Sequence, residues 1–334
     1  MYLSVLGGEI RALSGFGRAR FALTAEMTGP SKPLQIQSSS APGLRKFAAG
    51  GYLYALLDAY DNPTVPQKVQ ELGQESAVSL FVGEAEKKYW DLAPYLIVVQ
   101  EETLDWMVRT IWNAPCGVFI LSKSGLESLR THFRRFLIVQ LPDGERWFFR
   151  YYDPRILKIY LSNCRADELE VFFGPVRAFG IPEPESDQVS LLHTGQEVRG
   201  VGDSSGSSPF LRIRREQHQA LDQATAEEFE ERVIKFMKNA FPGPCKALGD
   251  QGIRELVRYG TRSASSYGFT RENDQYQFIE LIFLLGRKFD QNPNLPWVQN
   301  ILKDSAEKDS SIKMTRLRQA ASEYLSQATR NPPQ

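Results

Sequence analysis

The sequence is poor in cysteine, and this scarcity bounds the class of protein. Among 334 residues there are three cysteines, odd in number and far apart in the chain: Cys116, Cys164 and Cys245. Such spacing argues against a disulfide framework and favours a reducing compartment. Hydrophobic residues nevertheless make up 42% of the chain. We therefore expect a globular protein with a sizeable core. Its length suggests two domains, with one large domain as the alternative.

An excess of charge of either sign is also missing. Lysine plus arginine and aspartate plus glutamate number 40 each, which argues against a dedicated nucleic-acid binder, because such proteins are usually basic. The most apolar run, residues 278–285, is too short to span a bilayer. Residues 1–10 contain no basic region followed by a long apolar core, so no signal peptide is visible. We expect a soluble, cytoplasmic protein that binds neither nucleic acid nor membrane.

Recognisable catalytic and metal-binding motifs are lacking as well. The three histidines, at positions 132, 193 and 218, have no partner His or Cys at the spacing of zinc ligands. The segment Ser122–Gly125 lacks the Gly-x-Ser-x-Gly pattern of a serine nucleophile. Cys116 would need a nearby histidine to act as a nucleophile, and no phosphate-cradling glycine loop is present. We predict no catalytic residue, no metal and no cofactor.

What the chain does contain is an aromatic, arginine-bearing stretch, residues 146–155. Residues 142–145 form a turn sequence that joins this stretch to the apolar run 136–141. Two such runs on either side of a turn predict a β-hairpin. In an extended strand, Trp147, Phe149 and Tyr151 would point to one face. Asp153 and Pro154 fit the N-cap and first position of a helix over residues 156–161.

Two arginines and two tryptophans are the candidate site residues around this stretch. Arg150 is expected on a covered sheet face, paired with a carboxylate that is either Asp153 or Asp58. Arg155 is equally well explained as a structural residue and as a cation offered to a partner's carboxylate. The remaining two candidates lie at element ends and are expected to be partly exposed anchors: Trp112 and Trp297.

Strand and helix patterns alternate before and after this stretch, which predicts an α/β domain with a mixed sheet and flanking helices. Apolar runs predict strands over residues 52–58, 77–82, 95–100, 117–121 and 176–181. Helical signals predict helices over residues 66–72, 103–112 and 124–135, the last opened by a Ser124–Glu127 capping box. Residues 18–24 resemble a strand, and residues 29–30, 38–40 and 42–43 indicate loops.

The composition changes after residue 181, and everything beyond residue 225 indicates helix. Residues 200–209 are rich in Gly and Ser and predict a flexible linker. Helices are expected over residues 226–241, 247–259, 272–289, 296–302 and 313–325. The predicted division is an unassigned extension (1–48), an α/β domain (49–182), a linker (183–212) and an all-α lobe (213–330).

Several spaced blocks together resemble the effector-adaptor (chaperone) family of type VI secretion systems, whose domain was first catalogued as of unknown function. The blocks are the strand ending at Asp58, Pro94–Val98, the strand at Gly117, and the motif with Arg150, Asp153, Pro154 and Arg155. The resemblance covers about residues 52–181. It implies an adaptor that binds an effector toxin, through the toxin's N-terminal region, and loads it onto the spike protein of the apparatus, with no catalysis.

Two alternatives remain open from the sequence. One is a hydrolase with a cleft at the strand ends of the α/β domain, which a cluster of titratable residues in a deep pocket would support. The other is a structural subunit of the same apparatus, which would form rings or filaments by itself.

Overall fold

The computed structural model describes residues 2–6, 9–13, 34–60, 62–195 and 210–330. The chain forms two compact units, and the boundary falls between Asp222 and Gln223. As predicted, the first unit combines sheets with flanking helices and the second is helical. No helix among the described residues has the length and apolar character needed to cross a membrane.

A seven-stranded sheet is the framework of the first unit. The strand order is β3-β11-β10-β7-β4-β6-β5. Every neighbouring pair is antiparallel, whereas we expected a mixed sheet. The strands are β3 (Gln35–Ser40), β4 (Leu53–Asp58), β5 (Ala77–Ser79), β6 (Pro94–Val98), β7 (Gly117–Ser122), β10 (Val176–Pro182) and β11 (Gln188–His193).

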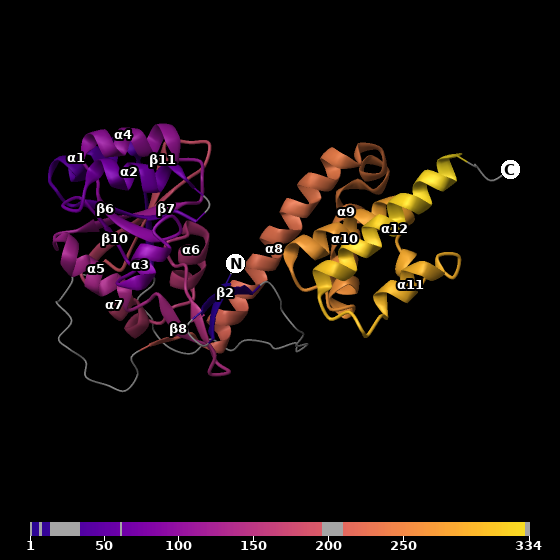
Figure 1. Ribbon diagram of the computed structural model, residues 1–334. Coiled ribbons are helices and arrows are strands. Elements are labelled where there is room, and N and C mark those ends of the chain that lie inside the picture. The colour runs from indigo at the N-terminus through magenta and orange to yellow at the C-terminus, as the bar shows by residue number, and fades with distance from the viewer. Residues whose placement is uncertain (1, 7–8, 14–33, 61, 196–209, 331–334) are drawn as a thin grey trace. The chain divides into compact units, whose positions relative to one another are not determined.

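The central strands are almost entirely apolar because both faces of the sheet are covered; the polar Asp58 and Ser122 stand at the ends of β4 and β7. In β4, Tyr54 and Leu56 enter one core, whereas Leu53, Ala55 and Leu57 enter the other, as the period of two in a strand requires. Helices α1, α2 and α4 cover one face and α5, α6 and α7 the other (Figure 1). The helices of this unit, with the short α3 included, are α1 (Ala41–Ala49), α2 (Thr64–Leu72), α3 (Glu84–Lys88), α4 (Glu101–Thr110), α5 (Leu126–Arg134), α6 (Pro154–Ser162) and α7 (Ala166–Phe173).

A second, smaller sheet packs on the α5–α7 side. Its order is β12-β8-β9-β1-β2; β8 and β9 form the predicted hairpin, and β12 pairs parallel to β8. Gly144 in the hairpin turn has φ 91°, a conformation that glycine adopts without strain. The strands are β1 (Tyr2–Leu6), β2 (Glu9–Leu13), β8 (Ile138–Gln140), β9 (Arg146–Phe148) and β12 (Leu211–Arg212).

The helical unit is built around α10, whose buried side chains contact several of the other elements. Gly260 permits a close approach of α9 to α10, since a Cβ there would lie 2.6 Å from Ile279 Cγ1. Phe278 of α10 packs against Phe269 and Phe289. The elements are α8 (Arg215–Ala240), α9 (Pro242–Ser266), α10 (Glu272–Leu285), the 3-10 turn η1 (Phe289–Gln291), α11 (Pro296–Leu302) and α12 (Ser310–Arg330).

Several predicted boundaries are wrong. Residues 38–40 and 42–43 are not loop, because β3 and α1 occupy them, and β11 lies in the segment interpreted as linker. The first unit therefore includes part of the unassigned extension and continues past Pro182 to Asp222. The change of unit occurs within α8, not at the predicted linker. The strand predicted at 18–24, the loop at 29–30 and the Gly/Ser-rich stretch 200–209 lie outside the described residues.

Two local predictions also fail for physical reasons. Strand β9 ends at Phe148, so Phe149 and Tyr151 do not alternate with it but are buried in the turn that leads into α6. Ser124 does not cap α5; Gly125 holds the N-cap position without a side-chain bond. The Ser124 carbonyl instead accepts a hydrogen bond from the Tyr54 hydroxyl at 2.9 Å.

Candidate functional site

The start of α6 is organised by the motif, as predicted. Asp153 is the N-cap of α6, and its carboxylate accepts from the backbone N–H of Arg155 at 3.0 Å. Pro154 occupies the first turn, where a helix has no use for a backbone donor. This cap holds Asp153 in place, with its side chain almost fully buried.

Arg150 is largely buried and paired with a carboxylate, as predicted, and the structure selects between the two alternatives; it lies in the turn after β9, however, and not on a sheet face. Its guanidinium forms an ion pair with Asp58, at the end of β4. The side chains of Arg150 and Asp58 are 12% and 3% exposed. The guanidinium also lies over the ring of Tyr60, 5.3 Å from its centroid. Two blocks 92 residues apart in the sequence are thereby joined at one end of the large sheet.

The electrostatics of this cluster follow from its burial. Burial raises the pKa of the Asp58 carboxyl, and the neighbouring Arg150 opposes that rise. Cys116 lies close by, and burial raises the pKa of its thiol to about 11. The thiol is therefore protonated at neutral pH, which does not favour a nucleophile. The cavity beside Cys116 has a volume of about 10 Å³, enough for one water.

Arg155 differs from Arg150 in exposure. Its guanidinium is 44% exposed and contacts Asp153 through two hydrogen bonds, of 2.9 and 2.6 Å. Asp153 thus holds a cation in a defined orientation at the surface of the first unit. This geometry is compatible with both interpretations of Arg155, structural and partner-binding.

The two tryptophans differ from each other. Trp112 is 7% exposed, and its indole N–H donates to the Ser186 carbonyl at 2.6 Å, so the expectation of a partly exposed anchor is wrong for this residue. Trp297 is partly exposed, as predicted, and its ring centroid lies 6.2 Å from that of Tyr324 in the helical unit. Whether either contacts a partner remains a prediction.

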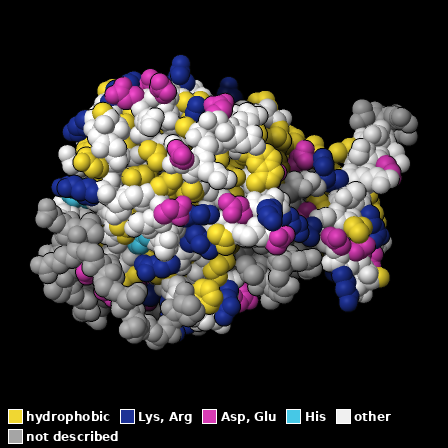
Figure 2. Space-filling view, turned by 60° about the vertical axis from the view of Figure 1, so that its left-hand side comes forward, with side chains coloured by type: hydrophobic (Ala, Val, Ile, Leu, Met, Phe, Trp, Pro, Cys, Tyr) yellow, Lys and Arg dark blue, Asp and Glu magenta, His cyan; other side chains and the backbone are white. Residues whose placement is uncertain are grey.

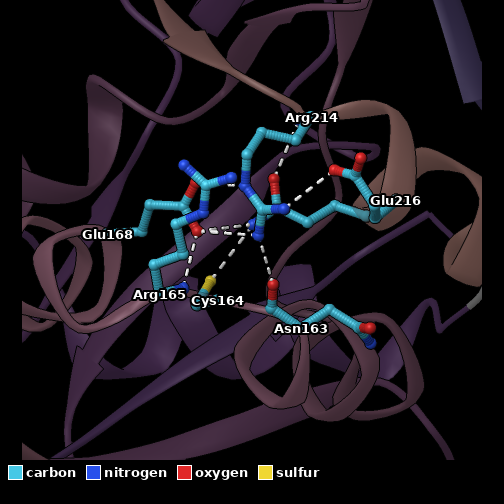
Figure 3. A network of polar contacts seen from close by, with 7 residues as sticks. Asn163, Cys164, Arg165, Glu168, Arg214 and Glu216 are labelled. Atoms are coloured by element: carbon cyan, nitrogen blue, oxygen red, sulfur yellow. Dashed lines mark hydrogen bonds and ion pairs between the residues drawn. The ribbon is translucent and has the colours of Figure 1, made fainter. Parts of the chain in front are cut away.

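A network around Arg214 is the most connected polar cluster that sequence reasoning missed (Figure 3). The guanidinium donates to Glu168 of α7 at 2.6 Å, to the Asn163 carbonyl at 2.6 Å and to Glu216 at 2.9 Å. Gln217 donates to the same Glu168 at 3.1 Å and accepts from the Arg214 backbone N–H at 2.9 Å. The network therefore fastens the first turn of α8 onto α6 and α7. Its signal in the sequence is weak, because the contacts with Glu168 and Asn163 span about fifty residues.

A groove in the helical unit is larger than the cavity beside Cys116. It lies between α10 and α12, has a volume of about 370 Å³, and we name it the α10–α12 groove. Leu281 and Ala321 are buried in it, whereas Leu284 is 42% exposed. Glu280 and Arg318 line it as well and form an ion pair of 3.7 Å. The accessible apolar surface of the groove therefore comes from Leu284 and the partly exposed Leu325, and charged and hydroxyl side chains complete its lining.

The face drawn in Figure 2 carries charged side chains of both signs. Figure 2 shows Lys and Arg side chains interspersed with Asp and Glu on the face that it presents. Among the described residues, no group of three or more His, Cys, Asp or Glu side chains is placed to hold a metal ion. His132 is buried, and one of its ring nitrogens lies 2.9 Å from the Phe172 carbonyl oxygen, which identifies it as a core residue.

Comparison with known proteins adds one result. Neither the curated proteins nor the solved structures gave a match. Asp58, Arg150 and the Asp153–Arg155 motif all lie within one matched region: residues 53–170 match the family model described as "Domain of unknown function (DUF4123)".

Proposed function

We propose that this protein is an adaptor that binds a type VI secretion effector and loads it onto the spike protein of the apparatus. The observation that carries the proposal is the ordered set of blocks resembling that adaptor family. Its first block and its arginine motif meet in the buried Asp58–Arg150 ion pair. In this proposal Arg150, Asp153 and Pro154 build the α/β unit, and Arg155 together with the α10–α12 groove binds the partners.

On the α/β unit, the proposed contact is the exposed guanidinium of Arg155. The Asp153 carboxylate holds it with two hydrogen bonds, so little side-chain entropy remains to be lost on binding. A carboxylate of the spike protein is the proposed partner, because the guanidinium is 44% exposed and a cation at the surface attracts a carboxylate.

On the helical unit, the proposed site is the α10–α12 groove, and its occupant is an amphipathic helix from the N-terminal region of the effector. Leu284 and the partly exposed Leu325 offer apolar surface in the groove, and an amphipathic helix can place apolar residues spaced by three or four against them. Ala321 and Ser322 are small, which allows a helix backbone to come close. Glu280 and Arg318 offer both signs of charge to the polar flanks of that helix.

Co-purification tests the adaptor function directly. The full chain is mixed with the effector and the spike protein encoded beside its gene, and complexes are separated by size. We expect co-elution with both partners. Elution of this protein apart from each of them would refute the adaptor role.

A matched pair of substitutions tests the groove. Leu284 and Leu248 are both 42% exposed and both lie in the helical unit, but only Leu284 lines the groove. We expect Leu284→Asp to weaken effector binding by about tenfold or more, because a carboxylate would be buried against apolar surface. Leu248→Asp should leave the affinity unchanged. Equal affinities of the two variants would place the effector elsewhere.

A further inference from the structure

Asp290, in η1, is a buried carboxylate that lacks an ionic partner among the described residues. It is 1% exposed. Its Oδ2 accepts from the Ser263 hydroxyl at 2.9 Å and from the Tyr267 hydroxyl at 3.2 Å. Its Oδ1 is buried and makes no hydrogen bond in the described part of the chain. Leaving a buried acceptor unsatisfied costs free energy, and a buried charge costs more, so this arrangement requires an explanation.

The neighbouring Tyr259 extends the polar cluster toward the surface. Its hydroxyl is buried and makes no hydrogen bond of normal geometry within the described residues. The Ser263 hydroxyl, one helical turn away, is nevertheless close enough to lower the pKa of Tyr259. Burial raises the pKa of Tyr259, and the negative charge of Asp290 raises it further, which places the two groups within electrostatic reach. The Tyr259 ring is only partly buried, so it connects the cluster with solvent.

Arg287 shows that the partly exposed ring of Tyr259 can bind a guanidinium. Its exposed guanidinium lies over the Tyr259 ring, 4.9 Å from the centroid. A second guanidinium reaching past that ring would find two acceptors, Asp290 Oδ1 and the Tyr259 hydroxyl oxygen. Guanidinium presents several donors in a planar fork, whereas an ammonium is a compact, strongly hydrated charge.

We propose that Asp290, Tyr259 and Tyr267 form a pocket that receives an arginine side chain of a partner protein. The guanidinium would donate to Asp290 Oδ1 and to the Tyr259 hydroxyl, and it would neutralise the buried carboxylate. The pocket is separate from the α10–α12 groove, and the inference holds whichever protein supplies the arginine.

The test uses the full chain and a minimal probe, N-acetyl-arginine methylamide, titrated by NMR. We expect saturable shifts of the signals of Ser263 and Tyr267, with much weaker shifts for the lysine analogue and none for the glutamine analogue. Asp290→Asn keeps an acceptor for Ser263 and Tyr267 and removes the charge. It should weaken probe binding at least about tenfold, as expected for a charge-assisted hydrogen bond. Absence of saturable shifts in the wild type would overturn the proposal.

Stability measurements separate this site from a purely structural role. Without probe, Asp290→Asn should melt a few degrees higher than the wild type, because a buried charge without a counter-ion is removed. Glu255→Gln makes the same change of charge on the exposed face of α9, one turn from Tyr259, and should alter neither melting nor binding. A lower melting temperature of Asp290→Asn with unchanged probe binding would identify Asp290 as structural and refute the pocket.

Arg287→Ala addresses the possibility that the chain's own arginine is the guest. With the Tyr259 ring face uncovered, we expect unchanged melting and tighter probe binding. A marked loss of stability without tighter binding would assign the carboxylate to Arg287 and overturn the proposal.

Discussion

Replacing Arg150 with alanine tests the physical basis of the motif. The substitution would leave the Asp58 carboxylate, 3% exposed, with one described donor, the backbone N–H of Tyr60 at 3.0 Å. It also removes the cation from the Tyr60 ring. Breaking a buried ion pair by removing one partner costs about 3–5 kcal/mol. We therefore expect the free energy of unfolding of the α/β unit to fall by that amount.

Urea denaturation followed by tryptophan fluorescence measures this loss. In a Trp297→Phe background, the four remaining tryptophans all lie in the first unit, at positions 90, 106, 112 and 147. With a urea slope of about 2 kcal/mol/M, the unfolding midpoint should fall by about 1.5–2.5 M. Arg150→Met combined with Asp58→Asn should recover much of the loss, since no unpaired charge is then buried.

Arg155→Ala is the matched control. Its guanidinium is 44% exposed, whereas the Asp153 carboxylate is 4% exposed, so we expect a loss of about 1–2 kcal/mol, smaller than for Arg150→Ala. Asp153 keeps the backbone N–H of Arg155 and remains near Arg150. Equal losses for the two alanine variants would refute the reasoning and remove Arg155 from the proposed interface. A loss below 1 kcal/mol for Arg150→Ala would refute the role assigned to the buried pair.

The remaining predictions concern His132 and Gly260. Burial lowers the pKa of His132 to about 4 from an unfolded value near 6.5, so its stabilising contribution is complete above pH 6.5 and is lost as the pH falls toward 4. The loss should reach about 3 kcal/mol in urea titrations, and His132→Gln should abolish this component; parallel pH profiles would contradict it. Gly260→Ala should destabilise the helical unit by about 1–3 kcal/mol in thermal melts, because its Cβ would overlap Ile279. Gly243→Ala, with open space around the new Cβ, should not destabilise it, and equal melting temperatures would disprove the steric argument.

The central strands and the helix at the motif were predictable because their signals are local. Two adjacent residues, Asp153 and Pro154, are enough to indicate the start of a helix. The apolar run of β7 is likewise enough to indicate a buried strand, without knowledge of the strands beside it. Strand β3 carried no such signal. It is a polar edge strand, Gln35–Ser40, and only its pairing with β11 makes it a strand.

The candidate site was less predictable because its contacts are long-range. Two carboxylates were equally good partners for Arg150, and only the fold selects Asp58. Trp112 is the last residue of the helix predicted over 103–112, a position that favours exposure. In the structure the loop at Ser186 covers it, and the Ser186 carbonyl accepts its indole N–H.

The strand order has a practical consequence for anyone who expresses part of this protein. A fragment trimmed to residues 53–170 would lose β3, β10 and β11, three of the seven strands of the large sheet. β7, which is buried along its whole length, would then become an open edge with unpaired backbone groups and invite aggregation. A fragment of residues 1–222 keeps those strands, the partners β1 and β2 of the smaller sheet and the first turns of α8, and is the piece we expect to stay in solution.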